Sequence, residues 1–135
     1  MIEINRDGFS FEVDTEKTKH YYSNTTPCEC EYCRNYYSHI SNMFPKIEAF
    51  LSEFGIDITK PDNTTPVEAD GKIVYSPAGY TVCGRILNAP NERITIRDTA
   101  DIELIFYNGY AFPNEQSGDY FSVSLYNITI PINKP

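Results

Sequence analysis

A regular alternation of apolar and polar residues in the second half of the chain limits its possible folds most strongly. From Gly71 onward, apolar side chains recur at every second position, as they do at Ile94 and Ile96. This spacing is typical of a β-strand with one buried face. Turn-forming residues divide the region at intervals that favour an antiparallel sheet. We therefore expect residues 71–132 to be rich in β-structure.

Two interruptions of this alternation predict irregular backbone, and a third irregular segment precedes it. Pro77-Ala78-Gly79 predicts a turn between two strands. The apolar positions of the last strand change parity, so we expect a bulge near Leu125 and Tyr126. Residues 59–66 are polar apart from two prolines, which predicts a loop that leads into the sheet.

Residues 1–14 predict a β-hairpin. Asp7-Gly8 is a hairpin turn signal, and apolar residues alternate with polar ones on both sides of it. After the hairpin, His20-Tyr21-Tyr22 indicates a third short strand.

Residues 26–55 carry a different pattern, which is typical of two helices. Thr26 suits an N-cap, and with Glu29 it forms a capping box that predicts the start of the first helix. The second helix is expected to run from Pro45 to a C-cap at Gly55. Apolar residues recur at steps of three and four in both helices: Cys28, Tyr32, Tyr36, Ile40 and Met43 in the first, and Ile47, Phe50, Leu51 and Phe54 in the second.

The length and composition of the chain indicate one domain over residues 1–135. Of these 135 residues, 41% are hydrophobic, which is enough for a core of its own. The patterns together predict an α+β fold. It is an antiparallel β-sheet or small β-sandwich of about seven or eight strands, with a two-helix insertion after the first hairpin.

The charge of the chain argues against nucleic acid as a partner. Asp and Glu number 19 against 11 Lys and Arg, the net charge is −8, and the basic residues are scattered. Phosphate backbones require clustered cations, whereas an acidic surface favours a basic protein partner. The chain also shows no signal peptide and no run of roughly 18 apolar residues that could span a membrane. We therefore expect a cytoplasmic protein whose thiols stay reduced.

Three of the four cysteines are close together, at Cys28, Cys30 and Cys33. Thiolates are zinc ligands, and a tetrahedral zinc site needs a fourth one. The sequence offers three candidates for this fourth ligand: Cys83, His20 and His39.

The predicted start of the first helix conflicts with this metal site. In a helix that begins at Thr26, Cys28 and Cys30 would point to nearly opposite sides. A site with three thiolates therefore requires the segment before Tyr32 to be a loop.

Two other interpretations of the cysteines stay open. Cys30 and Cys33 have the spacing of a redox dithiol at a helix N-terminus, although Glu29 and Glu31 should oppose thiolate formation. The cysteines can also act as small buried hydrophobic residues, which is the interpretation that the sequence favours.

The segment Cys28-Glu29-Cys30-Glu31-Tyr32-Cys33-Arg34-Asn35 resembles that of a group of small, uncharacterised bacterial proteins. The resemblance extends to Phe44-Pro45, to Gly55-Ile56-Asp57 and to the aliphatic last strand. It implies a bacterial cytosolic domain over most of the chain. No activity is attached to that group, so the resemblance implies no functional residue.

The sequence contains no recognisable catalytic constellation, so we expect a protein that is not an enzyme. The first hypothesis is an interaction module, of the inhibitor or immunity type, that binds a basic protein. The alternative is a zinc or thiol site on the three clustered cysteines, and otherwise no cofactor is expected. A third hypothesis is a β-domain that binds a small ligand or carbohydrate through Tyr110 and Phe112, in the long connection before the last strand.

Overall fold

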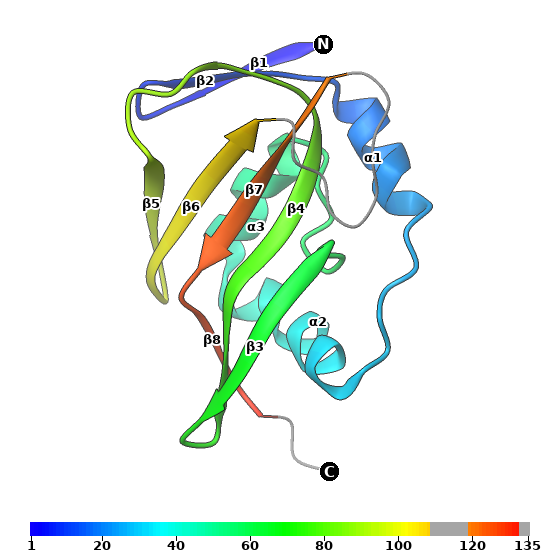
Figure 1. The fold of residues 1–135 in the computed structure, drawn as a ribbon, viewed down its shortest axis with the longest axis vertical. Coiled ribbons are helices and arrows are strands. Elements are labelled where there is room, and N and C mark those ends of the chain that lie inside the picture. The colour runs from blue at the N-terminus through cyan, green and yellow to red at the C-terminus, as the bar shows by residue number, and fades with distance from the viewer. Residues whose placement is uncertain (109–118, 133–135) are drawn as a thin grey trace.

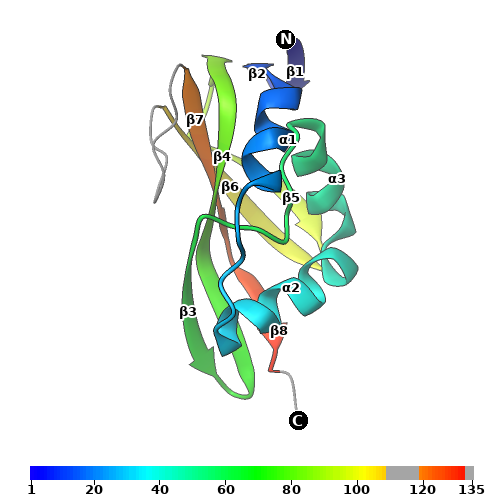
Figure 2. The ribbon, with the colours of Figure 1, turned by 90° about the vertical axis from the view of Figure 1, so that its right-hand side faces the viewer.

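The computed structural model describes residues 1–108 and 119–132, which form an eight-stranded antiparallel sheet and three helices. The helices cover one face of the sheet (Figure 2). This arrangement confirms the predicted α+β fold as a single sheet. In chain order the elements are β1 (Ile2–Arg6), β2 (Phe9–Val13), α1 (Thr15–Ser23), α2 (Glu31–Met43), α3 (Pro45–Glu53), β3 (Asn63–Ala69), β4 (Lys72–Asn88), β5 (Arg93–Asp98), β6 (Ala100–Asn108), β7 (Tyr120–Tyr126) and β8 (Ile128–Pro131).

Strand β4 is the centre of the sheet (Figure 1). It is 17 residues long and pairs with four other strands. β2 and β3 lie along one of its edges, and β7 and β8 lie along the other. The order β1-β2-β4-β7-β6-β5 then extends the sheet in both directions.

The predicted turn at Pro77-Ala78-Gly79 is wrong, because β4 continues through it. The predicted loop over residues 59–66 is confirmed for residues 59–62 and wrong for residues 63–66, because β3 begins at Asn63. The reason is pairing on both sides: Gly79 faces Asn63 of β3 and Ser124 of β7. A Cβ atom at Gly79 would collide with the side-chain oxygen of Asn63, so this glycine permits close packing inside a strand.

The N-terminal hairpin is confirmed, with Asp7 and Gly8 at positive φ in its turn. The predicted third strand is wrong, because His20, Tyr21 and Tyr22 lie in helix α1. The side chain of Asp14 caps this helix by accepting a hydrogen bond from the backbone N–H of Lys17 at 3.0 Å.

Helix α1 fills a gap along one edge of β4, between the segments that pair with β2 and β3. The hydroxyl of Tyr22 donates to the backbone oxygen of Thr81 at 2.7 Å and accepts from its N–H at 2.8 Å. The N–H of Cys83 donates to the hydroxyl of Thr18 at 3.0 Å. A helix thus satisfies strand groups that would otherwise be buried without partners.

The helical pair is confirmed, but the first helix starts later than predicted. Cys30, and not Thr26, is the N-cap of α2, so residues 24–30 form a loop. α3 begins at Pro45 as expected, and the backbone turns at Gly55 with φ of 88°. The N–H of Ile56 then bonds back to the oxygen of Leu51 at 3.3 Å, as in a glycine C-cap.

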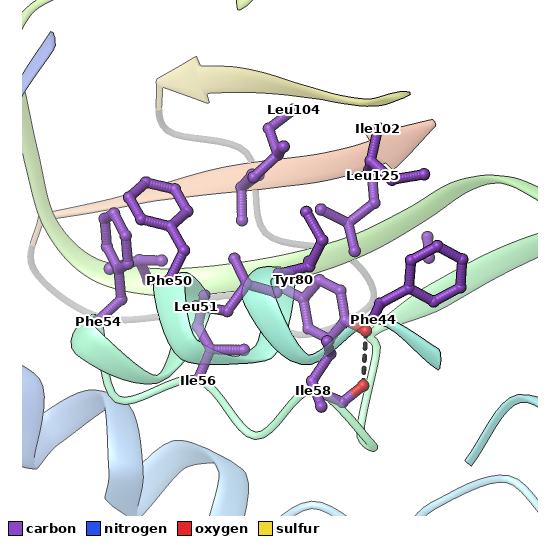
Figure 3. Packing of buried hydrophobic residues seen from close by; sticks show 14 of the residues in the cluster. Phe44, Phe50, Leu51, Phe54, Ile56, Ile58, Tyr80, Ile102, Leu104 and Leu125 are labelled. Carbon is purple, nitrogen blue, oxygen red and sulfur yellow. Dashed lines mark hydrogen bonds between the residues drawn. The ribbon is translucent and has the colours of Figure 1, made fainter. Parts of the chain in front are cut away.

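The core lies between the helices and the sheet. Phe50 and Leu51 of α3 and its C-cap residue Phe54 point toward Leu104 and Leu125 of the sheet (Figure 3). Burial of each such side chain contributes about 1.5–3 kcal/mol. The hydroxyl of Tyr80 also reaches the helical layer, where it donates to the backbone oxygen of Ile58 at 2.6 Å (Figure 3).

The predicted parity change in the last strand is present. It occurs at Asn127, which has φ of 71° and separates β7 from β8. Phe121, Val123 and Leu125 before it and Ile128 after it are all buried. One residue in the left-handed region therefore keeps the apolar side chains of both strands in the core.

None of the helices in the described residues has the length and apolar character needed to cross a membrane.

Candidate metal centre

The loop before α2 brings three sulfur atoms together. The Sγ atoms of Cys28, Cys30 and Cys33 all lie within 4.8 Å of one another. Cys28 and Cys30 are exposed, Cys33 is half-buried, and all are free thiols. The loop that a three-thiolate site requires is therefore present.

Backbone N–H groups hold two of these sulfur atoms. The N–H of Cys33 points at Sγ of Cys30 at 3.4 Å, and the N–H of Cys30 points at Sγ of Cys28 at the same distance. Cys30 thereby acts as the side-chain cap of α2, the role that the sequence assigned to Thr26.

Contacts with the sheet fix the start of α2. The hydroxyl of Tyr75 donates to the backbone oxygen of Tyr32 at 2.6 Å. The side-chain amide of Asn35 donates to the oxygen of Pro131 at 3.0 Å. Arg34 and Asn35 follow the last cysteine directly, so the cysteine loop is attached to a rigid support.

The surroundings shift the pKa values of two of the thiols in opposite directions. The backbone N–H of Cys33 lowers the pKa of Cys30, and thiol hydrogen bonds from Cys33 and Cys28 lower it further. Burial raises the pKa of Cys33 to about 12, with a further contribution from its hydrogen bond to Cys30. Cys30 is therefore the thiol that carries negative charge more readily, while Cys33 holds its proton.

Acidic residues alternate with the cysteines along the loop. Glu29 and Glu31 are exposed, and the charge of Glu68 on β3 raises the pKa of the Tyr32 hydroxyl. We expected Glu29 and Glu31 to oppose a thiolate, yet the pKa of Cys30 is lowered, chiefly by the backbone N–H of Cys33 at the start of the helix. Negative charge beside three thiols favours a cation there.

The other predicted ligands lie elsewhere. Cys83 is buried in β4 against α1, where burial raises its thiol pKa. His20 lies on α1 with its Nε2 at 3.0 Å from the side-chain nitrogen of Asn24. His39 lies on α2, beyond Cys33. Within residues 1–108 and 119–132, only the three clustered cysteines form a group close enough together to hold a metal ion.

The predicted ligand-binding residues Tyr110 and Phe112 lie outside the described residues. Their role stays a prediction.

One residue near the cluster had no role in the sequence analysis. Tyr37 follows Cys33 by one helical turn, and its hydroxyl oxygen is buried with no hydrogen-bond partner among the described residues. Its spacing of four residues from Cys33 is a signal that the sequence does contain.

The geometry of the cluster fits a thiophilic cation. Zn–S bonds of about 2.3 Å at tetrahedral angles place sulfur atoms about 3.8 Å apart. Sulfur atoms within 4.8 Å of one another can reach that spacing by small side-chain rotations. An external two-electron oxidant could also join two of these sulfur atoms in a disulfide, because they lie close together.

Comparison with known proteins gave no matching family model, no similar curated protein and no similar solved structure. The resemblance of the cysteine segment to a group of small bacterial proteins stays a prediction.

Proposed function

We propose that this protein binds a thiophilic divalent cation, zinc, through the thiolates of Cys28, Cys30 and Cys33. The observation that carries the proposal is the convergence of the three sulfur atoms within 4.8 Å. It is supported by the loop that precedes α2, since a helix from Thr26 would have separated the sulfur atoms.

The surroundings of the sulfur atoms support metal binding over simple packing. A cysteine that serves as a small hydrophobic residue is buried. Cys28 and Cys30 are exposed, while Cys83 shows the buried state that packing predicts. Reduced thiols are required for the site, so a cytoplasmic location forms part of the proposal.

Metal analysis of the reduced protein tests this function. We expect one zinc ion per chain after equilibration with zinc and removal of the excess, and its loss in Cys33→Ser. Cys83→Ser is the matched control, because it removes a thiol that lies apart from the cluster. Wild-type protein without bound zinc, or equal zinc in Cys33→Ser, would contradict the proposal.

A second candidate function is a non-enzymatic interaction module, of the inhibitor or immunity type, for a basic protein. The net charge of −8 supports it, because complementary charge speeds association. Affinity purification from cells at low and at high salt tests this function. We expect a specific partner with a basic surface that high salt releases; an acidic partner, or none, would contradict it.

A further inference from the structure

The cysteine cluster offers three ligand atoms and no fourth. The Sγ atoms of Cys28, Cys30 and Cys33 lie within 4.8 Å of one another, and within residues 1–108 and 119–132 no histidine, carboxylate or further thiol joins this group. Zinc must therefore take its fourth ligand from outside the group. An element that forms only three bonds needs no other ligand, so the three sulfur atoms suit it without any addition.

Trivalent arsenic and antimony are elements of this kind. Each forms three bonds directed to the base of a pyramid, and a lone pair of electrons occupies the apex. Both are soft centres, which bind sulfur in preference to oxygen. The base of such a pyramid is a triangle of three neighbouring ligand atoms, and three mutually close sulfur atoms are what the cluster provides.

Backbone contacts orient the sulfur atoms before any ligand binds. The N–H of Cys30 points at Sγ of Cys28, and the N–H of Cys33 points at Sγ of Cys30, each at 3.4 Å. The three cysteines belong to one short loop and the first turn of α2, so one atom can bond to all of them without joining distant segments of the chain. Ligand groups that are positioned in advance lower the entropy that binding costs.

The surface around the cluster admits a small uncharged molecule. Cys28 and Cys30 are exposed, and all three thiols are free. In neutral water, trivalent arsenic and antimony exist as uncharged trihydroxides, which the exposed carboxylates of Glu29 and Glu31 do not repel. The product with three thiolates is also uncharged, whereas zinc with three thiolates has a net charge of −1. The neighbouring acids therefore oppose the arsenic complex less than the zinc complex.

We propose that Cys28, Cys30 and Cys33 together bind trivalent arsenic or antimony, supplied as the trihydroxide. Each sulfur atom forms one bond to arsenic, one arsenic–oxygen bond breaks, and the thiol proton leaves with the hydroxide as water. Three thiols and one arsenic trihydroxide thus give one three-thiolate complex and three water molecules. Arsenic stays trivalent, so the step requires no oxidant or reductant. The inference rests on the three-cysteine site of the proposed function and adds a class of ligand to it.

Mass spectrometry of the intact protein tests this inference with arsenite as the probe. Reduced, metal-free protein is freed of the reducing agent and mixed with arsenite. A complex with three thiolates gains one arsenic atom and loses three hydrogen atoms. A complex with two thiolates keeps one hydroxide, so it gains one arsenic and one oxygen atom and loses one hydrogen atom. We expect the first mass in the wild-type protein.

Serine variants identify the sulfur atoms that take part. Cys33→Ser should lose the three-thiolate mass completely, and so should Cys28→Ser, which changes an exposed loop residue on which the core does not depend. Cys83→Ser is the matched control, because it removes a buried thiol that lies apart from the cluster. It should give the same mass as the wild-type protein.

The outcomes distinguish this inference from the proposed zinc site. Wild-type protein with only the two-thiolate mass, or with no arsenic, overturns the inference. A three-thiolate mass that persists in Cys28→Ser or disappears in Cys83→Ser also overturns it. Zinc binding without an arsenic complex leaves the proposed function intact and removes this inference. An arsenic complex in a protein that binds no zinc supports this inference and removes the proposed function.

Discussion

Two regions of the molecule carry hydroxyl or thiol groups in different states. One is the edge of β4 beside α1, and the other is the cysteine loop before α2. At the β4 edge, Thr18 and Tyr22 bond to the backbone of Thr81 and Cys83. At the loop, three thiols gather near the surface and the neighbouring Tyr37 hydroxyl has no partner in the described residues.

The difference separates polar groups that bond within the fold from polar groups that are exposed or have no partner among the described residues. Where every partner is supplied by the chain, burial of polar atoms stabilises the fold. Where partners are missing, the chain carries a cost in free energy that binding can remove. The same contrast distinguishes Cys83, which is buried, from the exposed Cys28 and Cys30.

Removal of the Tyr22 hydroxyl should have the largest effect on stability. Tyr22→Phe leaves the buried N–H and C=O groups of Thr81 without partners, so we expect a loss of about 3 kcal/mol in the free energy of unfolding. Urea denaturation measures this loss. Tyr107→Phe is the control, because it removes an exposed tyrosine hydroxyl from β6. A change as small as that of this control would show that the β4 edge does not depend on α1.

Acid should weaken zinc binding at the cysteine loop. Cys33 has a pKa of about 12 and therefore holds its proton near neutral pH, so it must release this proton to bind zinc. The lowered pKa of Cys30 makes its own proton easier to remove. We expect zinc affinity to fall about tenfold per pH unit for each proton released, as a competition titration with a chelator would measure. An affinity independent of pH would contradict thiol ligation.

Much of the fold followed from local patterns, because those patterns are complete within a few residues. The Asp7-Gly8 turn and the C-cap at Gly55 depend only on their neighbours. Helix α1 was missed although the N-cap Asp14 is a local signal for it. The aromatic pair Tyr21 and Tyr22 favoured a strand, and the bond that places Tyr22 in the core is to Thr81, 59 positions away.

The candidate site was only partly predictable for a related reason. The sequence predicted Thr26 as the N-cap, whereas the structure has Cys30. Bonds from Tyr75 to Tyr32 and from Asn35 to Pro131, which join distant parts of the chain, accompany the later start. The sequence therefore identified the three cysteines but favoured a helix that would have kept them apart. It also gave no sign that Tyr37 lacks a partner, because only the tertiary structure reveals which hydroxyls are paired.

The order in which the thiols react with an alkylating reagent should reflect the contrast between the two regions. The pKa of Cys30 is lowered, and those of Cys33 and Cys83 are raised by burial. We expect iodoacetamide to modify Cys30 before Cys33, and Cys83 only after unfolding, as peptide mapping by mass spectrometry would detect. Early modification of Cys83 would remove the contrast between the regions.

Removal of the Tyr37 hydroxyl should have the smallest effect on the metal-free protein. Tyr37→Phe eliminates a buried group that has no partner in the described residues, so stability should stay the same or rise by up to about 1 kcal/mol. Its comparison with Tyr22→Phe by urea denaturation is direct, because both variants lose one hydroxyl. A loss similar to that of Tyr22→Phe would mean that Tyr37 has a structural partner.

The central proposal is that the sulfur atoms of Cys28, Cys30 and Cys33 of one chain bind zinc. X-ray absorption of the zinc-loaded protein measures this most directly. The account predicts three sulfur neighbours at about 2.3 Å and one oxygen or nitrogen neighbour at about 2.0 Å. Four sulfur neighbours, or a shell without sulfur, would contradict it.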